Sequence, residues 1–235
     1  GDRVVGYACS VADFENCQRL VNFALHRFGR LDLLVNNAGI SMEGDISEMH
    51  PLVINDVIDT NVKGSMYLTR AATQSLIQTN GGIVFVNSCA AYQGIPGYSI
   101  YCASKAALQS FADAVRLELE PKNVFVGNMF VGFTKNDQEK KILSPSGRWK
   151  PQPQRDFVHQ HSQDGVAAAI VEMYRQRIPE KTLTSLGILS KWLNRVAPVL
   201  PKLFLKRHYQ RSIQHSNGKL SADSMVNDRS RAAFD

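Results

Sequence analysis

The stretch Ile83-Val84-Phe85-Val86-Asn87-Ser88 is a run of four apolar residues that ends in two polar ones. A short, continuously apolar run is typical of a parallel strand that is covered on both faces. Leu31 to Val35 and Val124 to Met129 have the same character, and longer segments separate the three runs. We therefore expect three strands of one buried sheet.

The segments between these runs carry apolar residues at helical spacing, and one of them ends at Gly29, a residue favoured just past a helix. Strands that alternate with helices predict an α/β fold, a doubly wound parallel sheet. A further strand is expected at Arg3 to Cys9. The predicted helices cover Val11 to Phe28, Pro51 to Gln78, Tyr98 to Glu120 and Gly165 to Arg177.

Polar or glycine-containing motifs follow each of the three apolar runs. They are Asn36-Asn37-Ala38-Gly39, then Ser88, then Val131-Gly132-Phe133-Thr134. Ligands of open parallel sheets bind beyond the carboxyl ends of the strands. The three motifs therefore predict a ligand site along one edge of the sheet.

Tyr101 and Lys105 lie four residues apart on the predicted helix that follows Ser88. A tyrosine with its ordinary pKa of about 10 is a poor acid or base near neutral pH, but an ammonium group one helical turn away stabilises the phenolate. We expect Lys105 to lower the pKa of Tyr101 and make it a general acid or base. Tyr92 and Tyr98 have no lysine four residues later, so we expect them to have packing or pocket roles.

From about Val4 to about Arg177 the order of these motifs, with Asn61 between them, resembles the short-chain dehydrogenase/reductase family. The resemblance implies a Rossmann-like fold and hydride transfer between NAD(P)(H) and a small-molecule carbonyl or alcohol. It implies four catalytic residues: Ser88 binds the substrate oxygen, Tyr101 exchanges its proton, Lys105 assists Tyr101 and binds the nicotinamide ribose, and Asn61 holds a water that links Lys105 to solvent.

The resemblance also implies the cofactor-binding residues. It does not decide between NAD and NADP, of which we predict NADP. Two positions depart from the family pattern: Val131 stands where the family has proline, and Ser10 stands where it often has an aspartate that contacts adenine. The implied cofactor-binding residues are Asn37, Ala38, Gly39, Tyr101, Lys105, Gly132 and Thr134.

The glycine-rich turn that holds the cofactor pyrophosphate in the family would precede Gly1. We expect the chain to be a fragment that lacks the first βα units. The rival interpretation, a natural truncated form, predicts weak or no dinucleotide binding. The alternative function is accordingly a non-catalytic scaffold or binding protein that has lost the cofactor.

The chain of 235 residues, 44% of them hydrophobic, is long enough for one domain, which we expect to cover residues 1–185. Its four cysteines have no metal-ligand or paired-redox spacing, and no secretory signal is seen at its start. We expect a cytoplasmic protein without a metal site. The resemblance adds a homo-oligomer as the expected assembly.

A basic and apolar helical extension is expected at residues 186–215, before a polar tail at 216–235. Seven basic residues and no acidic ones lie between Leu186 and Lys219, so the rest of the chain is nearly neutral despite a net charge of +6. This distribution argues against a nucleic-acid partner. Residues 186–213 could instead lie on an anionic membrane surface or pack on the domain or a partner subunit, with Pro198 and Pro201 breaking the segment into two helices.

Residues 135–163 are polar and lack clear periodicity, so we expect a loop over the site that influences substrate choice. Trp149 and Phe157 in this loop are candidates for contact with a hydrophobic substrate or for anchoring the loop.

Overall fold

The computed structural model describes residues 4–135, 140–152, 160–207 and 209–210. Contacts within the chain divide it into two compact units, residues 1–191 and residues 192–235. The predicted domain limits at residues 185 and 215 stay predictions.

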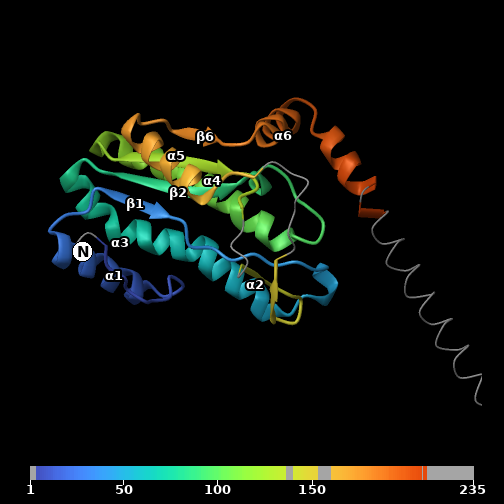
Figure 1. The fold of residues 1–235 in the computed structure, drawn as a ribbon, viewed down its shortest axis with the longest axis horizontal. Coiled ribbons are helices and arrows are strands. Elements are labelled where there is room, and N and C mark those ends of the chain that lie inside the picture. Colours follow the sequence, from blue (N-terminus) through green and yellow to red (C-terminus); the bar gives the residue numbers. More distant parts are fainter. Residues whose placement is uncertain (1–3, 136–139, 153–159, 208, 211–235) are drawn as a thin grey trace, which may run out of the picture. The chain divides into compact units, whose positions relative to one another are not determined.

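The first unit is built on one parallel sheet of four strands in the order β1-β2-β3-β6 (Figure 1). This architecture confirms the predicted parallel α/β fold. Asn36, Phe85 and Asn128 occupy the same level of three neighbouring strands, so the carboxyl ends of these strands lie at one edge. The strands are β1 (Leu33–Asn36), β2 (Gly82–Ser88), β3 (Phe125–Val131) and β6 (Glu180–Thr182).

All four predicted helical segments form helices, with ends within a few residues of the predicted ones. The long second segment contains a π-helical turn, Asp59–Lys63, between two α-helices. The α-helices are α1 (Phe14–Phe28), α2 (Pro51–Ile58), α3 (Gly64–Thr79), α4 (Ser99–Leu119), α5 (Gln163–Arg175) and α6 (Ser185–Val196).

Helices cover both faces of the central strands. Because successive side chains of a strand point to opposite faces, Ile83 and Phe85 of β2 pack against a cluster contributed by α1, α3 and α4. Val84, between them, packs against Met173 of α5 on the other face. The doubly wound arrangement follows from this apolar run, since both of its faces are covered.

The segment predicted as a loop over residues 135–163 contains an antiparallel hairpin in its described part. Its strands are β4 (Lys141–Leu143) and β5 (Trp149–Pro151). Ile142 and Leu143 are buried, and Leu143 packs in an apolar cluster with Met42 and Val53. Strands of three residues are too short to show a periodicity, which is why this hairpin and the equally short β6 were not predicted. Phe157 lies outside the described residues.

The strand predicted at residues 3–9 is wrong for its described part, because residues 4–10 have no regular secondary structure. A strand is stabilised by backbone hydrogen bonds to a neighbouring strand, and no strand of the four-stranded sheet pairs with this segment. Val4 is 85% exposed, and Val35 of β1 is 36% exposed. Within the described residues β1 is the edge strand of the sheet. The exposure of Val35 separately shows that β1 is not covered on both faces as predicted.

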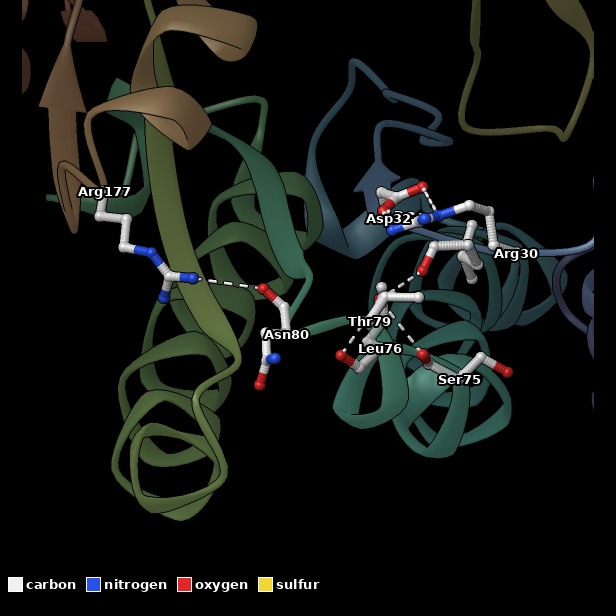
Figure 2. Close-up of polar contacts among 8 residues, drawn as sticks. Arg30, Asp32, Ser75, Leu76, Thr79, Asn80 and Arg177 are labelled. Atoms are coloured by element: carbon white, nitrogen blue, oxygen red, sulfur yellow. Dashed lines mark hydrogen bonds and ion pairs between the residues drawn. The ribbon is translucent and has the colours of Figure 1, made fainter.

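Side chains and backbone carbonyls join the loops at the edge of the sheet opposite to the polar motifs (Figure 2). The Thr79 hydroxyl donates a hydrogen bond to the Leu31 carbonyl at 2.8 Å. Arg177, which has a φ of 51°, donates from its guanidinium to the carbonyls of Asn80 at 3.2 Å and Asn123 at 3.5 Å. The Thr79 bond joins the end of α3 to the segment before β1, and the Arg177 bonds join the end of α5 to the segments before β2 and β3.

In the second unit, α6 ends at Val196 and residues 199–207 form another helix. The predicted break near Pro198 is confirmed. The predicted division into two helices is thus borne out, with Pro201 in the first turn of the second helix, where a missing N–H costs no hydrogen bond. No described helix is long and apolar enough to cross a membrane.

We expect Arg177→Ala to lower the free energy of unfolding by about 1 kcal/mol, because two carbonyl hydrogen bonds made by an exposed cation are lost. Urea unfolding followed by circular dichroism measures this change. Arg175→Ala is the matched control, since Arg175 is exposed on the last turn of α5. Equal stability of the two variants would contradict the role given to Arg177.

Candidate active site

Asn61 lies in the π-helical turn between α2 and α3 and is fully buried. Its side-chain oxygen accepts a hydrogen bond from the Ile40 N–H at 2.8 Å, and its side-chain nitrogen donates to the Ile40 carbonyl at 2.9 Å. Single π-helical turns within α-helices often occur at functional sites. Here the turn places one amide against the backbone that follows β1.

The same amide of Asn61 also connects to the helix that carries Tyr101. Its nitrogen donates to Ser104 Oγ at 3.0 Å, and the Ser104 hydroxyl donates to the Tyr101 carbonyl at 2.7 Å. Ser104 is fully buried, and sequence reasoning assigned it no role. The available signal was a hydroxyl three residues after Tyr101, on the same side of the helix.

A Cβ on Gly39 would lie 3.2 Å from Asn61 Oδ1. A larger residue at this position would press on the amide of Asn61. The polar turn after β1 and the π-helical turn are thus fitted to each other.

Ser88 ends β2 and makes two interactions. Its Oγ accepts a hydrogen bond from the Ala90 N–H at 3.1 Å, which caps the short 3₁₀ helix Cys89–Ala91. Its side chain also lies beside the Tyr101 hydroxyl, where it acts to lower the pKa of the phenol. Ser88 therefore both caps the backbone that follows β2 and lies beside Tyr101.

Lys105 is buried, and its Nζ donates to the Val86 carbonyl at 3.0 Å. The Nζ atom lies 5.8 Å from the centre of the Tyr101 ring. Asn87, which sequence reasoning did not select, donates to the Lys105 carbonyl at 3.2 Å and accepts from the Ser88 N–H at 2.8 Å. Asn87 thereby ties the end of β2 to α4 at the residues flanking the site.

Burial dominates the electrostatics of this cluster. It lowers the pKa of Lys105 to about 8, with a smaller contribution in the same direction from Lys140. Burial also raises the pKa of Tyr101 above its usual value, and the Ser88 side chain only partly offsets this effect. The expectation of a Tyr101 pKa below its usual value is therefore wrong for this structure, because desolvation disfavours the charged form of the phenol and outweighs the effects that favour it.

The residues predicted to bind the cofactor lie along the carboxyl edge of the sheet. Asn37, Ala38 and Gly39 are exposed just beyond β1. Gly132 and Thr134 follow β3, and Thr134 forms a parallel β-bridge with His161. Gly132 has no room for a side chain, since a Cβ there would lie 2.6 Å from Thr184.

Tyr92 lies on the packed side of this region. Its ring stacks on Phe130 with the centroids 4.8 Å apart, and its hydroxyl shares a hydrogen bond with Thr182 Oγ1 at 2.9 Å. Burial raises its pKa. These contacts agree with a packing role for Tyr92. No group of three or more histidine, cysteine or acidic side chains within the described ranges is placed to hold a metal ion.

A comparison with protein families matches residues 1–146 to the short-chain dehydrogenase model. The chain belongs to the short-chain dehydrogenase family. Over an aligned stretch of 143 residues it is 41% identical to the 11-beta-hydroxysteroid dehydrogenase-like 4A protein of Arabidopsis thaliana. This stretch covers 59% of this chain and 47% of the plant protein. The chain thus spans about half the length of this curated relative.

Two solved structures are similar in fold to this short-chain dehydrogenase. One is a short chain dehydrogenase from Burkholderia cenocepacia in complex with NADP, with a TM-score of 0.73 at 20% identity, covering 87% of this chain and 79% of that one. The other is ElxO with NADP bound, with a TM-score of 0.53 at 29% identity, covering 55% of this chain and 53% of that one.

We expect Asn61→Ala to lower the free energy of unfolding of this short-chain dehydrogenase by about 3 kcal/mol, because the Ile40 backbone groups lose buried hydrogen-bond partners. Urea unfolding measures the change. Asn55→Ala, at an exposed position of α2, is the control and should change stability by less than about 0.5 kcal/mol. Equal values for both variants would show that the Asn61 hydrogen bonds contribute little.

The lowered pKa of Lys105 also predicts a pH dependence of stability. Between pH 8 and the ordinary pKa of 10.5, the unfolded chain binds more protons at this residue than the folded chain does. The contribution of Lys105 to the free energy of unfolding therefore rises with pH in this window. Other groups also titrate there, so the comparison is with Lys105→Met. We expect the difference between wild type and variant to change by up to about 1.4 kcal/mol per pH unit; parallel profiles would contradict the assignment.

Proposed function

We propose that the protein is an NAD(P)-dependent oxidoreductase that interconverts a carbonyl and an alcohol. The single observation that carries this proposal is the placement of Tyr101, whose hydroxyl lies beside the Ser88 side chain and whose ring lies beside Lys105, at the carboxyl edge of a parallel sheet. Family membership supports the same reaction class.

The groups around this edge fit a dinucleotide in their chemistry. The Lys105 ammonium and the Tyr101 hydroxyl are donors suited to a ribose, and Asn37 and Thr134 add an amide and a hydroxyl nearby along the edge. When bound, the cofactor supplies or accepts the hydride. We propose NADP rather than NAD, because NADP is the cofactor in the ElxO structure.

In the reducing direction, Tyr101 acts as the acid. Its phenol is protonated near neutral pH and can give its proton to the substrate oxygen. Because burial raises the pKa of Tyr101 and so disfavours this transfer, the reaction depends on groups that stabilise the phenolate. Ser88 donates a second hydrogen bond to the substrate oxygen. The phenolate left on Tyr101 is stabilised by Lys105, which is mostly charged at pH 7 with a pKa of about 8. A proton from water then restores the phenol.

Asn61 is proposed to position the site rather than to hold water with its amide. All polar atoms of the Asn61 side chain are engaged by Ile40 and Ser104, and its backbone carbonyl accepts from the Ser65 hydroxyl at 3.0 Å. The proton path implied by the resemblance would have to use other atoms. The amide instead holds Tyr101 through Ser104.

A hydrophobic substrate is the proposed class. The 41% identical plant relative is named for hydroxysteroid dehydrogenases, and the hairpin beside the site carries Trp149, which is 53% exposed. We also propose a homo-oligomer, on family resemblance.

The test is the Tyr101→Phe variant of the protein. Removing the hydroxyl removes the proton donor but leaves the ring and Lys105, so we expect turnover to fall by at least roughly 100-fold. NADPH affinity, measured by fluorescence titration, should change little. Ketone reduction is followed by NADPH consumption.

Tyr98→Phe is the control, because Tyr98 precedes the same helix and has no lysine four residues later. Near-normal turnover in Tyr101→Phe would overturn the assignment of Tyr101. An absence of any saturable signal with NADPH or NADH would instead favour the non-catalytic scaffold.

A further inference from the structure

The second unit carries an exposed apolar face that the proposed reaction does not use. Val199 and Leu203 are 62% and 48% exposed, and Leu200 and Phe204 are 57% and 70% exposed. Residues four apart lie on the same side of a helix. These two pairs therefore form one apolar stripe along the helix of residues 199–207, whereas Leu205 on its other side is only partly exposed.

The last turns of α6 add to this exposed apolar surface. Trp192 and Val196 are four residues apart and are 65% and 69% exposed. Tryptophan is favoured at membrane–water interfaces, because its ring is apolar and its N–H can still reach water. Contiguous exposed apolar surface of this kind marks an interaction site.

The cations among these apolar residues identify the partner's charge. Arg195, Lys202, Lys206 and Arg207 are all exposed, and none of them forms an ion pair with another residue of the described ranges. Residues 182–222 contain no aspartate or glutamate. The partner must therefore supply negative charge along with apolar contact.

Two other partners fit this combination less well. A second copy of the same face would bring like charges together, which opposes association. Nucleic acid would satisfy the cations but would leave several exposed leucine and valine side chains without apolar contact. An anionic lipid surface satisfies both, because its headgroups meet the cations and its acyl region takes up the apolar side chains.

We propose that residues 192–207 bind the surface of a membrane containing anionic lipids, with the two helical segments lying in the interface. Binding of this kind would hold the enzyme at the surface without crossing the bilayer. The proposal does not depend on the reaction catalysed by the first unit.

Vesicle co-sedimentation tests this proposal with the complete chain. The probes are phosphatidylcholine vesicles with and without phosphatidylserine. We expect strong binding only to the anionic vesicles. The double variant Lys202→Glu with Lys206→Glu should reduce the partition coefficient on the order of 30-fold or more, and Leu203→Ser with Phe204→Ser should reduce it roughly tenfold or more.

Matched controls lie on the first unit. Leu117→Ser removes an apolar side chain that is 72% exposed on α4, and Lys122→Glu reverses an exposed lysine. Both should bind vesicles like the wild type. In a Trp149→Phe background, Trp192 is the remaining tryptophan, and its emission should shift to shorter wavelength when anionic vesicles are added.

Three results would overturn the proposal. The first is the absence of binding to the anionic vesicles. The second is equal binding by both double variants and the wild type. The third is a dimer that dissociates in the Leu203→Ser, Phe204→Ser variant while vesicle binding is unchanged, which would assign the face to a second copy of the chain.

Discussion

The buried amide of Asn61 is the interaction on which the candidate site depends. It holds the backbone after β1 through Ile40 and the helix of Tyr101 through Ser104, so three segments far apart in the sequence are fixed at one point. A fully buried amide is stabilising only when each of its polar atoms has a partner. The π-helical turn meets this requirement because it brings Asn61 within reach of all of them.

Burial shifts the pKa values of the two titratable groups in the site, and it also lowers the stability of the folded protein. Lys105 is removed from water, and its Nζ has one hydrogen bond to a backbone carbonyl. A charged ammonium in such a place is less stable than in water, which the lowered pKa expresses. The same desolvation raises the pKa of Tyr101, because it disfavours the phenolate. The proposed proton donor and the cation proposed to stabilise its conjugate base are thereby held together, at the expense of some folding stability.

Sequence reasoning predicted the parts of the fold that have long apolar patterns. The sequence shows the strands at Ile83 and Val124 and the helices between them clearly. Burial on one face produces a periodic pattern of apolar residues, and burial on both faces produces a continuous apolar run. Short elements contain too few residues to show such a pattern, so the sequence did not predict β6 or the hairpin of β4 and β5. The apolar residues at positions 4–9 resembled a strand, but strand formation requires a neighbouring strand, and this requirement cannot be read from one segment.

The same distinction separates the site residues that were predicted from those that were not. Tyr101 and Lys105 could be identified because a tyrosine and a lysine four residues apart on one helix are recognisable in the sequence. Asn87 and Ser104 could not, because they contribute through contacts with other elements of the fold. The pKa of Tyr101 was predicted in the wrong direction because spacing reports the neighbouring charge and not the depth of burial. Desolvation is a property of the packed structure, and it is the largest contribution to the pKa shifts of both Tyr101 and Lys105. The depth at which a site lies in the fold therefore has to be known before the acid–base properties of its residues can be inferred.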